Sequence, residues 1–168
     1  TCESLGATCG IVEDGNGGLL RCGMCLLPEL CGDDQRCVPI EEILWPNDWA
    51  TFEDQILALV NQQRAAGAYC SFDGETYPPA PPLSMNDALR QAARYHAKEM
   101  ADNSNGIHSC TEASNRMKYF GYTGWPVTES VAYGGDYGSV QQTVNLWMIS
   151  TACPEIMSRQ NKDVGVGV

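Results

Sequence analysis

The sequence predicts an α+β protein in which a small disulfide-rich module at the N-terminus precedes one larger globular domain. Six of the nine cysteines lie within residues 1–37, and the other three are spread over the rest of the 168 residues. After residue 50, apolar residues recur at helical spacing over two long segments, and they alternate near the C-terminus. We place the module and its linker over 1–44 and the globular domain over 45–168.

A module of about 40 residues buries too little apolar surface to offset its conformational entropy, so it needs cross-links or a metal. Cys22 and Cys25 have the spacing of zinc ligands, but the module has no histidine, and the next pair of cysteines is spaced differently. We therefore predict disulfides within the module and leave their connectivity open. The cysteines concerned are Cys2, Cys9, Cys22, Cys25, Cys31 and Cys37. Oxidised cysteines indicate a secreted protein, either extracellular or on the cell surface.

The formal net charge is −11, and no cluster of Lys and Arg interrupts this acidic character. Such a chain is a poor binder of nucleic acid and of anionic membranes, because both are recognised through clustered basic side chains. No apolar run approaches the roughly 18 to 20 residues of a membrane span. We therefore expect neither a nucleic-acid partner nor a transmembrane segment.

Two long helices are predicted after the linker. The first begins at Thr51, which with Asp54 resembles a capping box, and it ends at Gly67. The second is predicted to be capped by Ser84 with Asp87, and its apolar face carries residues 89, 93, 96 and 100. Because that face includes His96, we predict a hydrogen-bonded histidine in the core.

Shorter elements are predicted in the second half of the chain. Helices are expected over 114–120 and 139–147, and strands over 127–133 and 164–168. The chain stops inside the last of these strands. Because an edge strand normally turns back and pairs, we expect the native protein to continue beyond Val168 with a further strand.

Several short segments stand in an order that is informative as a set. They are Leu59-Val60-Asn61-Gln62-Gln63-Arg64, Pro81-Pro82-Leu83-Ser84-Met85-Asn86, residues 92–101, Ile107-His108-Ser109, Thr128-Glu129-Ser130-Val131-Ala132, Trp147-Met148-Ile149-Ser150 and residues 164–168. Together they resemble a domain of the CAP superfamily, also called SCP-like, of bacterial type. The resemblance covers residues from about 51 to 168.

The resemblance implies an α-β-α sandwich, with an antiparallel sheet between helical layers and a shallow cleft. In many members this cleft holds two histidines and two glutamates, and the histidines can bind a divalent metal such as zinc. By this resemblance His108 takes the first histidine position and Glu129 the first glutamate position. Ala152 stands where the second histidine would be, and no glutamate follows Trp147. We therefore expect no resident cofactor, and at most weak binding of a divalent metal at His108.

The resemblance also implies a pairing of Cys70 with Cys153, which leaves Cys110 as the odd cysteine. Alternatively, Cys110 pairs with Cys153 and Cys70 is left over. An odd cysteine in an oxidising compartment indicates an intermolecular disulfide, a free thiol or a partner cysteine beyond Val168.

These observations predict a secreted, non-enzymatic CAP-domain protein. Its degenerate cleft, with His108, Ser109 and Glu129, would bind an extracellular protein, glycan or lipid. One alternative is a structural subunit of an extracellular assembly that self-associates through the N-terminal module or Cys110. The other is a degenerate hydrolase, in which His108 acts as base for Ser109 or a water and Glu129 orients it.

Overall fold

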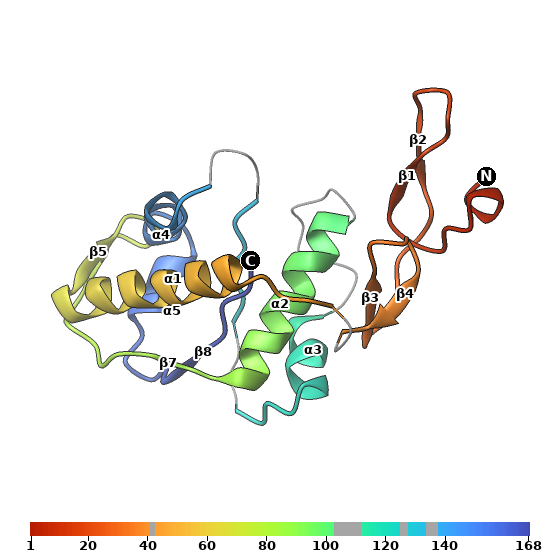
Figure 1. Cartoon of the computed structure of the whole chain (residues 1–168). Helices are drawn as coiled ribbons and strands as arrows, with labels where there is room; N and C mark the ends of the chain where they lie inside the picture. The colour runs from red at the N-terminus through yellow and green to blue at the C-terminus, as the bar shows by residue number, and fades with distance from the viewer. Residues whose placement is uncertain (41–42, 103–111, 125–127, 134–137) are drawn as a thin grey trace.

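The structure is a computed structural model of the chain, and it describes all residues except 41–42, 103–111, 125–127 and 134–137. It is an α+β protein with a disulfide-rich region at its N-terminus, as the sequence predicts. Figure 1 shows this region at one end of the molecule and the helical domain beside it. In the described residues the strands form four two-stranded ladders. No helix in this part of the chain is both long enough and apolar enough to cross a membrane.

The N-terminal module consists of a short 3-10 helix and two antiparallel hairpins. The hairpins pair β1 (Ile11–Glu13) with β2 (Leu19–Arg21), and β3 (Glu29–Cys31) with β4 (Cys37–Pro39), after helix η1 (Glu3–Leu5). Three disulfides join Cys2 to Cys22, Cys9 to Cys31 and Cys25 to Cys37. The sulfurs of Cys9, Cys25 and Cys37 lie within 4.8 Å of one another. Because all three are oxidised, they offer no thiolate to a zinc ion.

Helix α1 (Asn47–Ala66) packs against α4 (Val140–Met148) and α5 (Ala152–Met157) around the main apolar core. Buried residues of this core are Ile56, Val60, Leu83, Val144 and Val166. The predicted start of α1 at Thr51 is wrong. The helix begins at Asn47, and the hydroxyl of Thr51 donates to the Asn47 carbonyl at 2.8 Å, within the first turns. The predicted end is correct, since Gly67 follows Ala66 with a φ of 76°.

A hairpin that the sequence did not predict follows α1. Strands β5 (Ala68–Cys70) and β6 (Glu75–Tyr77) pair antiparallel. Cys70 forms a disulfide with Cys153 at the start of α5, and both cysteines are fully buried beside Met157. The alternative pairing of Cys153 with Cys110 is therefore wrong. Cys110 itself lies outside the described residues.

Helix α2 (Asp87–Asp102) begins later than the capping pattern predicts. Ser84 belongs to strand β7 (Ser84–Met85), which pairs parallel with β8 (Asp163–Val164). Its place as the cap is taken by Asn86, whose Oδ1 accepts a hydrogen bond from the Leu89 N–H at 3.2 Å. Because the helix starts at Asp87, Asn86 is the residue in the capping position, and Ser84 lies two residues too early to cap it.

The second half of the chain contains the predicted helices but fewer strand residues than expected. Helix α3 (Ala113–Tyr119) and helix α4 each agree with the prediction to within one residue at either end. Residues 128–133 belong to no strand, so that prediction is wrong for the described part of 127–133. Residues 165–168 also leave the ladder after Val164. Gly165 and Gly167 instead lie so close to the backbone of α2 that a Cβ would come within 2.0 Å and 2.2 Å of it.

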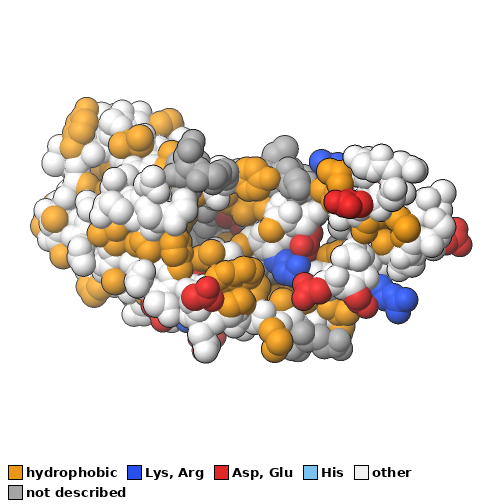
Figure 2. Space-filling model, turned by 45° about the horizontal axis from the view of Figure 1, so that its top comes forward, with side chains coloured by type: hydrophobic (Ala, Val, Ile, Leu, Met, Phe, Trp, Pro, Cys, Tyr) orange, Lys and Arg blue, Asp and Glu red, His pale blue; other side chains and the backbone are white. Residues whose placement is uncertain are grey.

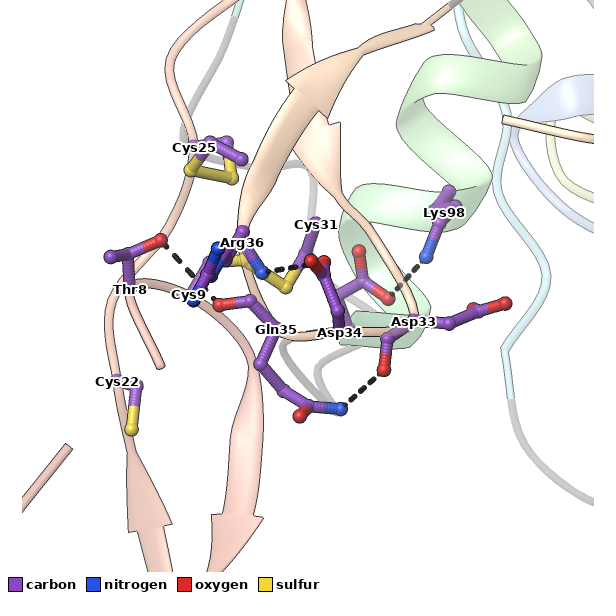
Figure 3. Close-up of a disulfide and its surroundings, with 12 residues drawn as sticks. Thr8, Cys9, Cys22, Cys25, Cys31, Asp33, Asp34, Gln35, Arg36 and Lys98 are labelled. Carbon is purple, nitrogen blue, oxygen red and sulfur yellow. Dashed lines mark hydrogen bonds and ion pairs between the residues drawn. A yellow bond between two sulfur atoms is a disulfide. The ribbon is translucent and has the colours of Figure 1, made fainter. Parts of the chain in front are cut away.

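The module packs directly on the helical domain. A second apolar cluster joins Leu30 and Ile40 of the N-terminal region to Tyr95 of α2, with Phe120 against it. Figure 3 shows Lys98 of α2 beside the module loop that carries Asp33 and Asp34. Lys98 itself donates to Asp102 at 2.8 Å. Burial raises the pKa of Asp102, the Lys98 hydrogen bond opposes this, and the nearby charge of Asp33 adds to it.

The linker is attached to the domain by a buried carboxylate. Glu53 of α1 is completely buried and accepts hydrogen bonds from Arg90, Arg94 and the indole of Trp45. The Arg94 guanidinium also lies over the Trp45 ring, 5.1 Å from its centroid. The entry of the chain into the domain is therefore held by charge-assisted hydrogen bonds as well as by packing.

Candidate functional site

Helix α2 brings a histidine and a glutamate together in the interior. His96 and Glu99 are three residues apart, which places them on the same side of the helix. The Nδ1 of His96 lies 3.1 Å from Oε2 of Glu99. His96 is 2% exposed, which agrees with its predicted position in the core. The Glu99 carboxylate therefore orients the imidazole ring.

The other side of the imidazole faces Glu129. This glutamate lies in the irregular segment 128–133, and its Oε2 is 3.6 Å from Nε2 of His96. That distance is too long for a hydrogen bond, and Nε2 has no hydrogen-bond partner among the described residues. His96 is thus held between two carboxylates that approach its two ring nitrogens from opposite sides.

Arg116 of α3 completes the group. Its side chain is 1% exposed, and its Nη2 donates to Oε1 of Glu129. We call His96, Glu99, Arg116 and Glu129 the polar cluster. A buried cluster of this kind is stable only when its charges are paired, so each member depends on the others.

The geometry of the polar cluster does not form a metal site. The two carboxylates approach different nitrogens of one imidazole, so no single ion can be bound by all three side chains. Within the described ranges, the only group of three candidate ligand atoms is formed by Cys9, Cys25 and Cys37, and disulfides hold all three. The polar cluster is suited to holding segment 128–133 against α2 and α3.

The site residues predicted from the sequence fall into two sets. His108 and Ser109 lie outside the described residues. Glu129 is described, and its side chain is 19% exposed. Ala152, at the position of the second family histidine, is 3% exposed and starts α5 with its N–H donating to Ser150 Oγ at 3.2 Å.

Sequence reasoning missed two members of the polar cluster, Glu99 and Arg116. Glu99 carried a usable signal, because a histidine and a glutamate three residues apart on a helix can contact each other. Arg116 carried none, since an arginine near the end of a short helix is usually solvated.

With this geometry established, comparison with known proteins identifies the family. The model of the CAP family, described as the cysteine-rich secretory protein family, matches residues 57–168. The chain belongs to the CAP family. The matched range includes every member of the polar cluster, and the disulfide-rich module of this CAP protein precedes it. Neither the curated proteins nor the solved structures include a match to this CAP chain.

Proposed function

We propose that this CAP protein is secreted and binds an extracellular partner or small ligand at the surface around Glu129 and His108, without catalysing a reaction. The observation that supports this most directly is the engagement of Glu129 by the buried Arg116. A catalytic glutamate needs a carboxylate oxygen that is free to take a proton or hold a substrate atom. Here the guanidinium holds one oxygen, and the other faces His96 at 3.6 Å.

The position of Ala152 supports the same proposal. A tightly held zinc ion needs three or four nitrogen, sulfur or oxygen ligands, and a buried alanine supplies none. The proposal therefore includes no resident metal and at most a weakly bound divalent ion at His108. A surface that keeps the family scaffold but lacks half of the family's polar residues is better suited to recognition than to turnover.

The proposed location outside the cytoplasm is supported by the disulfides. Three lie within the module and one joins Cys70 to Cys153. Such bridges form and persist in oxidising compartments. Membership of a family of secretory proteins points the same way.

The test measures binding and turnover in the same preparation. Palmitate and chitotetraose serve as lipid and glycan probes in calorimetric titrations, and fluorescein-labelled casein tests for peptide hydrolysis. We expect saturable binding of one probe and no turnover above a protein-free control. Ser130→Trp places a bulky ring on the exposed residue next to Glu129 and should abolish binding. Ser71→Trp, at an exposed serine of the β5–β6 turn, is the matched control.

Two results would contradict the proposal. Casein turnover that Glu129→Gln abolishes would establish the hydrolase alternative. Binding that survives Ser130→Trp would place the ligand elsewhere. For the metal, elemental analysis of the protein after purification in zinc should show less than one ion per chain, with His108→Ala as control.

One observation favours the second candidate function, a subunit of an extracellular assembly. Large apolar side chains are exposed on the module, with Leu19 at 71% and Leu26 at 83%. In addition, the other eight cysteines of the sequence pair with one another in four disulfides, which is compatible with an intermolecular disulfide at Cys110. Sedimentation velocity with and without reductant tests this function. A monomer under both conditions at about 100 μM would exclude it.

A further inference from the structure

The first hairpin of the module has an uncovered edge. Strands β1 and β2 form a two-stranded ladder that no other described strand joins. Figure 1 shows this hairpin extending away from the body of the molecule. Each strand of such a ladder pairs its backbone on one side only, and the other side presents N–H and C=O groups in a row.

The hydrogen bonds of the hairpin show which residues present these groups. The Cys22 N–H donates to the Gly10 carbonyl at 2.8 Å, and the Asp14 N–H donates to the Gly18 carbonyl at 2.9 Å. Residues 10 and 14 therefore direct their backbone toward β2, and so does Val12, which lies opposite Leu20. Because this direction alternates along an antiparallel strand, the backbone groups of Ile11 and Glu13 are directed to the outer edge.

A shallow groove lies beside β1. Leu5 of η1, Ile11, Val12, Glu13 and Gln35 line it. Leu5 is 50% exposed, and it supplies apolar surface to the groove. Most of the exposed lining of the groove is polar, so Leu5 is one apolar contact beside the backbone row of β1. Strand-addition sites bind an extended peptide mainly through backbone hydrogen bonds and use such side-chain contacts for specificity.

The negative charge of the module favours a positively charged ligand in the groove. The side chains of residues 1–40 include six acids against only Arg21 and Arg36. One of the acids, Glu13, lines the groove, and Glu3 lies in η1 with Leu5. Figure 2 shows most of the acidic side chains of the face in view toward the module end, with basic side chains among them. The whole chain carries a net charge of −11, so a second copy would bring like charges together.

We infer that the outer edge of β1 is a strand-addition site for an extended segment of another protein, in which Lys or Arg alternates with apolar residues. The backbone of the segment pairs with Ile11 and Glu13. Its apolar side chains contact Leu5, and its cationic side chains lie beside Glu13 and Glu3. This surface is separate from the one in the proposed function, because it belongs to the module and includes no residue of the polar cluster.

The test uses the full chain and two defined peptides. The first alternates Lys and Val three times, the second alternates Glu and Val, and both carry a fluorescein label. Fluorescence anisotropy at low salt should show saturable binding of the Lys-Val peptide at least ten times tighter than that of the Glu-Val peptide. The Lys-Val affinity should fall as salt is raised, because charges at the surface contribute to it.

Two variants at one position separate backbone pairing from charge. Glu13→Gln removes only the charge and should weaken Lys-Val binding by about three-fold, the scale of one exposed ion pair. Glu13→Pro also removes the outward N–H, which makes no hydrogen bond to β2. It should weaken binding of the Lys-Val peptide by about ten-fold or more. Peptide mass mapping of the three module disulfides verifies that each variant folds.

Amide exchange measured by NMR on the unmodified chain provides a readout that does not depend on any variant. In the free protein, the amides of Ile11 and Glu13 should exchange quickly and that of Val12 slowly. Saturation with the Lys-Val peptide should slow Ile11 and Glu13 at least ten-fold. Three results would overturn the inference: equal affinity for the two peptides, undiminished binding to a folded Glu13→Pro variant, or unchanged exchange at Ile11 and Glu13.

Discussion

Arg116 and Glu129 form a charge-assisted hydrogen bond at a depth where the arginine is 1% exposed. The glutamate occupies the position that the family resemblance assigns to the cleft, and the arginine comes from a short helix on which the sequence marked no functional residue. This pair joins α3 to segment 128–133 and places the carboxylate of Glu129 beside His96. The carboxylate of Glu129 is therefore positioned by a buried residue.

Arg116→Met should lower the free energy of unfolding by about 3 kcal/mol, because it leaves a partly buried carboxylate without its cation. Chemical denaturation monitored by circular dichroism measures the loss. Lys118→Met, at an exposed position of the same helix, is the matched control and should change stability by less than about 0.5 kcal/mol. In the double variant Arg116→Met/Glu129→Leu the loss should be smaller than in the single variant. A larger, additive loss would show that the two residues are not coupled.

Gly165→Ala should destabilise the domain by about 3 kcal/mol. The added Cβ would lie 2.0 Å from the backbone carbon of Leu89, and the backbone of a packed helix cannot move as a flexible side chain can. Gly138→Ala is the control, since a Cβ at that position meets nothing within 4 Å. Thermal unfolding followed by calorimetry compares the two, and equal melting temperatures would contradict the close approach of residue 165 to α2.

Arg64→Lys should cost about 2 kcal/mol or more even though the charge is kept. The fully buried Arg64 donates from Nε to Pro81 at 2.7 Å, from Nη1 to Ser158 at 3.0 Å and also to Ile156, and from Nη2 to Asn161 at 3.3 Å. A lysine ammonium cannot reproduce this planar set of donors, and several carbonyls would lose their partner. Arg159→Lys, at an exposed position nearby in the sequence, should be neutral. Urea denaturation of both variants tests the difference.

Asp102→Asn should change how stability depends on pH. Burial raises the pKa of Asp102 in the folded protein above its unfolded value, so the folded state binds more protons over the interval between the two values. The contribution of this group to stability is therefore greatest below that interval and declines as pH rises through the folded pKa. The free energy of unfolding of the Asp102→Asn variant, minus that of the unmodified protein, should therefore be more positive at pH 7 than at pH 3.

Asp73→Asn is the control of opposite sign. The hydrogen bond from Tyr77 lowers the pKa of Asp73, so this carboxyl stabilises the fold above its unfolded pKa and loses that contribution as pH falls. Denaturation midpoints measured from pH 3 to pH 7 compare the two variants. The same sign of change for both variants would contradict the assignment of Asp102 as a partly buried carboxyl whose pKa is raised.

Local patterns predicted the elements whose causes are local. The helix predicted over 139–147 is an example, since the Ser139 Oγ accepts a hydrogen bond from the Gln142 N–H and α4 starts at the next residue, one residue later than predicted. Ser84 shows the opposite case. Its sequence pattern was that of a cap, but pairing with β8, far along the chain, placed it in a strand. Intrinsic secondary-structure propensity describes the preference of a segment in isolation, and pairing with a strand far along the chain can outweigh that preference.

The sequence by itself determined that this protein has a cysteine-rich module stabilised by disulfides, an α+β domain of the CAP family and an acidic surface. These properties depend on composition, on spacing along the chain and on the order of motifs. Only the tertiary structure decided that Cys70 meets Cys153, that Arg116 holds Glu129 and that His96 lies between two carboxylates. The physical reason is that the pairs Cys70–Cys153, Arg116–Glu129 and His96–Glu129 join different elements of the fold, and their approach depends on how those elements pack rather than on a local pattern.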